Sequence, residues 1–93
     1  MQVGLHALGI GAGALRAVID AVAAASESSG FATLWAGEHV VMVDRSSSRY
    51  PYAEDGRIAV PPTADWNDPM VSLSFAAAST ETIGVATGVL LLP

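Results

Sequence analysis

The chain contains no cysteine and no lysine, and both absences narrow what it can do. Without cysteine it has neither a disulfide framework nor a thiolate-bound metal, and its two histidines and scattered acids lack metal-ligand spacing. Four arginines stand against nine acidic residues, which gives a formal net charge of −5. A basic surface that follows nucleic-acid phosphates is therefore excluded, and we expect neither a metal nor a nucleic-acid partner.

Charged residues of either sign are scarce as well. They make up 14% of the chain, whereas a typical soluble domain has roughly 25%. Hydrophobic residues make up 52%, too many for a disordered segment. The first twenty residues lack a basic leader, and Arg16 and Asp20 interrupt their apolar run. We therefore expect a cytoplasmic protein with no signal peptide, no membrane span and much of its surface covered by other protein.

The first third of the chain predicts a strand, a helix and a second strand. Residues 3–10 (VGLHALGI) are apolar and predict a short buried strand. From residue 14 to about 26, apolar side chains recur at helical spacing, at Leu15, Val18, Ile19 and Val22. Gly30 suits the left-handed position that ends a helix, and residues 31–36 (FATLWA) predict the second strand. Such a unit implies parallel strands with a right-handed crossover.

Residues 42–66 form a long excursion before the pattern resumes. This segment carries three of the four arginines and both tyrosines, and Asp55–Gly56 predicts a small hairpin. Asp68 and Pro69 then begin a second helix, as N-cap and first helical residue. Its residues are apolar nearly all round, so we expect it to pack on several faces. Residues 83–92 predict a third parallel strand, buried on both sides.

The glycines after the first strand allow two interpretations. Residues 9–14 (GIGAGA) match the G-x-G-x-x-A fingerprint of dinucleotide-binding half-domains, and Glu38 lies near the end of the second strand, where an acid binds ribose. A plain strand-to-helix turn fits the same glycines, because short glycine clusters are common in any such unit.

A longer pattern resembles a known family over nearly all of residues 3–93. It consists of Gly30-Phe31 before the second strand, Glu38-His39 at its end, the excursion from Arg49-Tyr50-Pro51-Tyr52 to Pro61-Pro62, Asp68-Pro69, and Thr87-Gly88-Val89. In this order the residues resemble the N-terminal third of luciferase-like flavin and deazaflavin oxidoreductases. The branch that uses coenzyme F420 is the most similar.

The resemblance implies an α/β fold, namely the first three parallel strands and two helices of a (β/α)8 TIM barrel. Such barrels need about 250 residues, so residues 1–93 would be the N-terminal part of an incomplete barrel, and this fragment alone would be inactive. The implied function is hydride transfer between coenzyme F420 and a small organic substrate, by a protein that is often a homodimer. A sister interpretation is an FMN-dependent monooxygenase.

The resemblance also implies a site at the carboxyl ends of the strands, where such barrels place their chemistry. His39 would be catalytic, with a structural histidine as the alternative. Thr87, Gly88 and Val89 would contact the cofactor ring, at a position where F420-using members carry a non-proline cis peptide. An ordinary glycine in a strand is the alternative for Gly88.

Three further residues are candidates for the same rim, namely Glu38, His6 and Gly9. Glu38 and His39 are expected to point to opposite faces because they are adjacent in an extended segment. An ion pair with an arginine of the excursion is the alternative for Glu38. Trp66 is expected to pack the excursion back over the mouth of the barrel.

Overall fold

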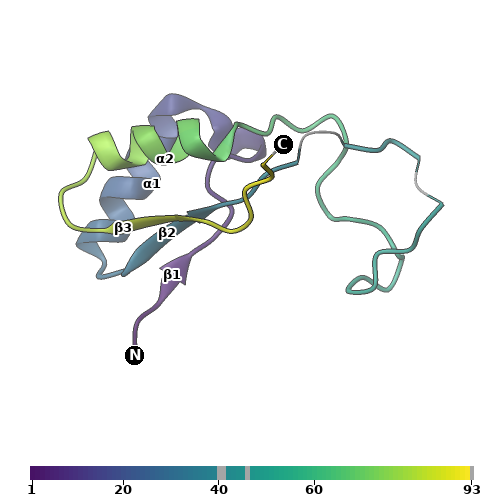
Figure 1. Cartoon of the computed structure of the whole chain (residues 1–93), viewed down its shortest axis with the longest axis horizontal. Coiled ribbons are helices and arrows are strands. Elements are labelled where there is room, and N and C mark those ends of the chain that lie inside the picture. The colour runs from purple at the N-terminus through teal and green to yellow at the C-terminus, as the bar shows by residue number, and fades with distance from the viewer. Residues whose placement is uncertain (40–41, 46, 93) are drawn as a thin grey trace.

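Three short parallel strands and two helices make up the body of the molecule (Figure 1). The computed structural model describes residues 1–39, 42–45 and 47–92. The elements follow in the order β1 (Gly4–Leu5), η1 (Gly11–Ala14), α1 (Arg16–Ser28), β2 (Thr33–Ala36), α2 (Pro69–Ala78) and β3 (Gly84–Thr87). The sheet has the order β1-β2-β3, so β2 pairs with both neighbours. The predicted α/β class with parallel strands is confirmed.

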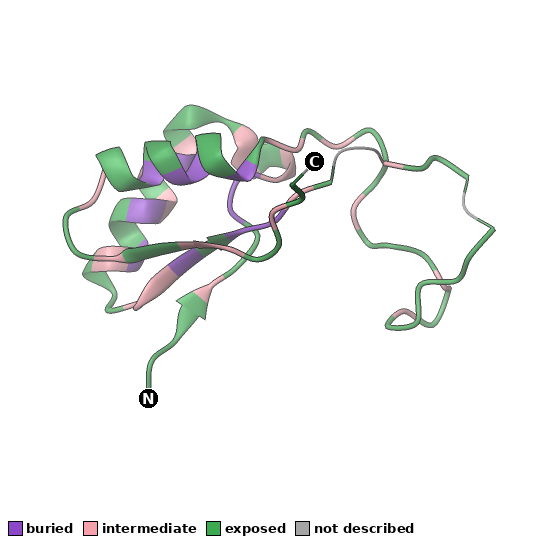
Figure 2. Cartoon of the chain, in the orientation of Figure 1, coloured by how far each residue is buried: buried purple, intermediate pink, exposed green. Residues whose placement is uncertain are grey.

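Both helices cover the same face of this sheet, and the core lies between them and β2 (Figure 2). Leu34 and Ala36 alternate along β2 and are fully buried on that face. Ile19 of α1 and Ala76 of α2 pack against them. Trp35, between the two buried residues, is 38% exposed on the opposite face, where no helix lies. The molecule is therefore a two-layer structure with one open sheet face.

The helix boundaries follow the signals in the sequence. Gly30 has φ +86°, the left-handed conformation that ends α1. The Asp68 side chain accepts hydrogen bonds from the backbone N–H groups of Met70 (2.8 Å) and Val71 (3.2 Å), and Pro69 is the first residue of α2. Both predicted boundaries are confirmed.

The start of α1 differs from the prediction. Leu15 has an extended backbone and forms the N-cap, so the helix begins at Arg16 and the Leu15 side chain is left exposed. The buried side of α1 is Ile19, Ala23 and Ser26 instead. Ile19 contributes the large apolar side chain on this side, and Ala23 and Ser26 are small.

The first strand is much shorter than the predicted residues 3–10. Only Gly4 and Leu5 pair with β2, at Thr33 and Leu34. Ala7 and Gly9 have φ values of +71° and +82°, and a left-handed residue interrupts an extended strand. The chain therefore turns sharply at the carboxyl end of β1.

Two surfaces that the sequence predicts to be buried are exposed. On β3, Val85 is 43% exposed, and Leu92 beyond the strand is 79% exposed. On α2, Met70 and Phe75 lie on an exposed apolar side, while Leu73 faces the core. The predictions were wrong because each surface meets only one covering layer among the described residues.

The excursion forms consecutive turns where the sequence predicts a hairpin. Asp55–Gly56 does make a turn: the Asp55 carboxylate accepts from the Arg57 N–H at 3.0 Å, and Gly56 has φ +69°. The Tyr50 N–H donates to the Gly56 carbonyl at 2.7 Å and closes this loop. No strand flanks it among the described residues, and Pro51 cannot donate to a ladder. The loop extends away from the body (Figure 1).

One carboxylate, Glu27 at the end of α1, holds the turn between α2 and β3. It accepts hydrogen bonds from the backbone N–H groups of Thr82 (2.7 Å), Ile83 (2.9 Å) and Glu81 (3.0 Å). These donors, Thr82 and Ile83 foremost, favour the ionised form and lower the pKa of Glu27 from 4.5 to about 2. The turn enters β3 directly, so this contact fixes where β3 begins beside β2.

A second packing feature lies where α2 meets the turn after β1. The Ser72 hydroxyl is fully buried and has no hydrogen-bond partner among the described residues. It contacts Gly9 so closely that a Cβ at this glycine would overlap the hydroxyl. The buried hydroxyl is therefore destabilising, because burial removes its bonds to water without replacing them.

Replacing Glu27 by Gln is expected to lower the melting temperature at pH 7. The lowered pKa means that the folded protein holds the ionised carboxylate more tightly than the unfolded chain does. This stability is present above pH 4.5 and is lost as the pH falls towards 2, so the two melting temperatures should converge there. Circular dichroism melts from pH 2 to 7 measure the difference, with Glu54→Gln as the exposed control. A difference that stays constant with pH would contradict this account.

Ser72→Ala is expected to raise the free energy of unfolding by about 1 kcal/mol, since it removes the unsatisfied hydroxyl. Ser74→Ala is a matched control on the same helix, with the same gain in helix propensity. There the hydroxyl donates to the Met70 carbonyl at 2.6 Å, and this bond is lost. Urea unfolding should therefore rank the Ser72 variant above the Ser74 variant, and the opposite order would show that the buried hydroxyl is satisfied.

Candidate functional site

The carboxyl ends of the three strands meet along one edge of the sheet, as parallel pairing requires. We call this edge the rim and define it as residues 6–9, 37–39 and 87–91. Two backbone hydrogen bonds connect its parts, from Leu8 N–H to the Trp35 carbonyl (3.2 Å) and from Gly88 N–H to the Ala36 carbonyl (2.7 Å). The rim thus contains all seven residues that the sequence analysis assigns to a site.

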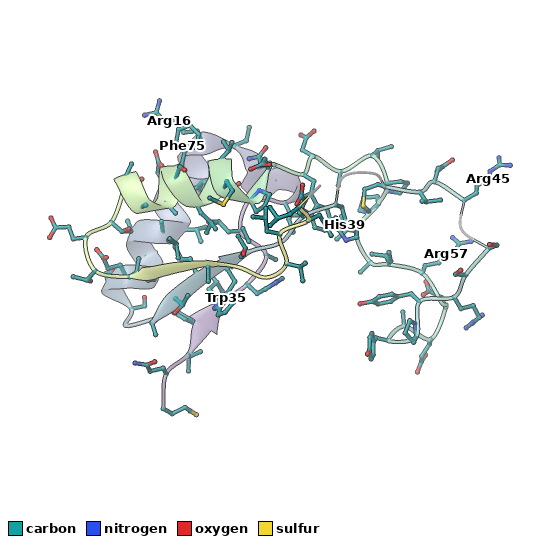
Figure 3. All side chains as sticks on the ribbon, viewed as in Figure 1. Arg16, Trp35, His39, Arg45, Arg57 and Phe75 are labelled. Carbon is teal, nitrogen blue, oxygen red and sulfur yellow. The ribbon has the colours of Figure 1, made fainter. Side chains whose placement is uncertain are left out.

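His39 lies exposed at the point where the excursion leaves the body (Figure 3). Its ring meets the edge of the Trp66 indole with 4.5 Å between centroids and 65° between planes. Trp66 in turn donates from Nε1 to the Gly37 carbonyl at 3.1 Å. His39 is therefore packed against the chain that returns from the excursion.

Residues 65–67, which we call the return segment, cover the glycine turn that follows β1. The backbone carbonyl of Asp65 accepts from the Gly11 N–H at 2.7 Å, and the Asn67 N–H donates to the Gly9 carbonyl at 3.0 Å. The Asn67 side chain also donates from Nδ2 to the Ala14 carbonyl at 2.7 Å. The sequence analysis missed Asn67, whose position just before the helix cap gave no signal of this distant contact.

The hydrogen bonds between the return segment and the glycine turn weaken the dinucleotide interpretation. A pyrophosphate binds the free backbone N–H groups of a glycine turn and of the helix N-terminus behind it. Here the Gly11 N–H is bonded to Asp65, and residues 11–14 form a separate turn before α1 begins at Arg16. The geometry favours the plain strand-to-helix turn.

Glu38 and His39 contact different parts of the chain. Its Oε2 atom accepts from the Leu91 N–H at 2.9 Å, which ties the end of β2 to the segment after β3. Among the described residues it makes no ion pair with an arginine of the excursion. Glu38 therefore organises the rim by a backbone contact.

His6 and Trp35 lie together on the open face of the sheet, beside two glycines. By register, His6 is the neighbour of Trp35, one position beyond the Leu5–Leu34 pair. A Cβ at Gly88 would lie 3.0 Å from His6 Nε2 and 3.6 Å from Trp35 Cε3, and one at Gly4 would lie 2.7 Å from Trp35 Nε1. Figure 3 shows Trp35 on the side of the sheet away from the helices. The missing side chains make room for these two rings.

The three residues predicted to contact the cofactor, Thr87, Gly88 and Val89, do not lie on one surface of the structure. Thr87 pairs with Ala36 and lies with Leu73 and Ser74 along a shallow hollow between α2 and β3. Gly88 faces the open side, and Val89 is 63% exposed. All described peptide bonds are trans, so the cis bond that the resemblance implies at Gly88–Val89 is absent here.

Comparisons with protein-family models, with curated proteins and with solved structures gave no match to this chain. Among the described residues, no three histidine, aspartate or glutamate side chains cluster in a way that could hold a metal ion. Over the same residues, no helix combines the length and apolar character needed to cross a membrane. The functional argument therefore depends on the rim itself.

Trp66→Phe is expected to loosen the return segment because it removes the Nε1 donor to Gly37. A lost neutral hydrogen bond costs about 1 kcal/mol. Amide hydrogen exchange should therefore speed up several-fold at Gly11 and Asn67, whose N–H groups bond across this contact. Trp35→Phe is the matched control and should leave these two amides unchanged. Equal acceleration in both variants would mean that the return segment is not held by Trp66.

Proposed function

We propose that residues 1–93 form the opening arc of a (β/α)8 barrel that transfers hydride between coenzyme F420 and a small organic substrate. The sequential strand order and the two helices on one face are what such an arc requires. The open face of the sheet, with His6 and Trp35, would then be the barrel interior. The same arrangement occurs in the first half of a doubly wound sheet, so the fold alone does not choose between them.

The observation that carries the proposal is the composition of the rim. It brings two imidazoles and the Gly88-Val89 pair to the edge where barrels place their chemistry. The competing dinucleotide site would need the Gly11 N–H, which already donates to Asp65. The rim therefore supports the barrel proposal more strongly than the dinucleotide one.

The Trp35 and His6 rings fill the space that Gly88 and Gly4 leave on the open face, so a planar ring would bind against these two side chains. A deazaflavin, when bound, would supply the hydride chemistry, while the protein orients it. Of this chain's residues, Gly88 and Val89 would lie near the ring, and imidazole groups would form hydrogen bonds with the substrate or move its proton. Glu38 would keep the chain after β3 in place through Leu91.

The product of the complete reading frame that encodes residues 1–93 is expected to bind F420 saturably. Titrations followed by the absorbance and fluorescence of F420, and in parallel of FMN, measure this. A polypeptide limited to residues 1–93 should bind neither, because its open sheet face leaves a ring with contacts on one side only.

The outcomes separate the alternatives. Binding of FMN without F420 would replace the proposal by the sister interpretation, a flavin-dependent monooxygenase. Binding of NAD alone would support a dinucleotide half-domain, despite the occupied Gly11 amide. Failure to bind any of the three would overturn the proposed function.

A further inference from the structure

We infer that two copies of the 93-residue chain associate through the outer edge of β3 and the hollow between β3 and α2. The two β3 strands would pair antiparallel about a two-fold axis at Ala86, which gives one continuous sheet with the helices of both copies on one face. This inference does not rest on the proposed function. In a complete barrel, the next strand of the same chain would take the place of the second copy.

The backbone of β3 presents unused hydrogen-bonding groups on its outer edge. Over the described residues, β3 pairs only with β2. The N–H groups of Gly84 and Gly88 both donate towards β2, the second to the Ala36 carbonyl at 2.7 Å. Because these groups alternate in direction along a strand, those of Val85 and Thr87 point outward. An unpaired edge of this kind is a template for another strand.

The sequence of this edge allows it to meet a copy of itself. Residues 83–92 contain no charged residue and no proline, so neither of these two features that block edge pairing is present. Like charges within this segment would therefore not face each other across a two-fold axis, although the whole chain has a net charge of −5. The opposite edge, β1, has only two residues, and so short an edge is a poor template.

The position of α2 sets the distance between the helices of the two copies. α2 runs along β2 and β3 and contacts both strands (Figure 1). Neighbouring strands lie about 4.8 Å apart, so pairing of the two β3 strands would place the two α2 helices two strand spacings apart, about 10 Å. Helices that pack against each other lie about 8–10 Å apart. Pairing at this edge would therefore bring the helices into contact and close the hollow.

The side chains that line the hollow complement each other in such a pair. Those of α2 recur at the spacing of one helix side, namely Met70, Leu73, Ser74 and Ala77. With the axis at Ala86, Met70 of one copy would lie opposite Ala77 of the other, so that a long side chain meets a small one. Val85 would pair with Thr87 of the second copy through two backbone hydrogen bonds. Met70 and Val85, which are 53% and 43% exposed, would become buried.

Analytical ultracentrifugation of the 93-residue chain tests the inference, and the expected mass is twice the chain mass of 9.5 kDa. Thr87→Pro removes an N–H that points outward, so it should leave the pairing with β2 intact and raise the dissociation constant of the dimer at least about tenfold. Phe75→Ser is the control, because Phe75 lies on the outer side of α2 and does not line the hollow. It should leave the dimer unchanged. Circular dichroism checks that each variant is folded.

A single cysteine locates the axis independently. Because the chain has no cysteine, Ala86→Cys would place the two thiols of the dimer opposite each other. They would form a non-hydrogen-bonded antiparallel pair with Cα atoms about 4.5 Å apart, a separation that allows a disulfide. Mild oxidation should therefore link most chains in pairs. Val3→Cys, which is exposed at the other edge of the sheet, should stay unlinked.

Four results would overturn the inference. The first is a chain that remains monomeric at all concentrations. The second is a dimer that Phe75→Ser dissociates and Thr87→Pro does not, which would place the interface on the outer side of α2. The third is linking of Val3→Cys without linking of Ala86→Cys, and the fourth is an assembly larger than a dimer. These measurements involve no cofactor, so their outcome is separate from that of the F420 titration.

Discussion

The parallel pairing of β2 with both of its neighbours is the constraint on which the rest of the structure depends. It brings three carboxyl ends to one edge and forces each connection to cross over the sheet. Because both crossovers pass on the same side, one face is packed with the helices and the other is left open. The candidate site exists only because the ends of β1, β2 and β3 are in register. In that register, Thr33 of β2 lies between Gly4 of β1 and Gly84 of β3.

Such short strands contribute few ladder hydrogen bonds, so contacts outside the sheet must hold the register. Glu27 does this at the amino ends by receiving three backbone N–H groups from the turn before β3. Asn67 and Glu38 do it at the carboxyl ends, the first at Gly9 and Ala14, the second at Leu91. Glu27, Glu38 and the Asn67 amide group each bond through the side chain to the backbone of a distant segment, and the contact between Asn67 and Gly9 is a backbone hydrogen bond. Side-chain contacts therefore add to the backbone hydrogen bonds at both ends of the sheet.

The sequence predicted the helix boundaries, which depend on interactions between residues that are close together in the chain. Gly30 and Asp68 act on the few residues next to them, so their roles as helix boundaries could be inferred without a structure. The length of β1 could not, because Ala7 adopts a positive φ that its residue type does not favour. The contacts of Glu27 and Asn67 join residues far apart in the chain, and nothing nearby marks them. For the site, position at the strand ends was predictable, but the partners were not, because His39 meets Trp66 and Glu38 meets the Leu91 N–H, both far along the chain.

The scarcity of charge noted at the outset corresponds to three separate apolar surfaces. The first is the β3 edge with Val85, the second is the open face with Trp35, and the third is the outer side of α2 with Met70 and Phe75. Large exposed apolar patches are rare on free monomers and mark surfaces that other protein covers. The barrel that we propose would cover the first two, because further strands would pair with β3 and close over Trp35.

The barrel would leave the outer side of α2 uncovered, since barrel helices face outward. Arg16, whose guanidinium lies 5.9 Å from the Phe75 ring centroid, covers only part of that surface. Closure of the sheet therefore accounts for the edge and the open face, and the outer side of α2 needs a separate explanation, such as a contact between subunits.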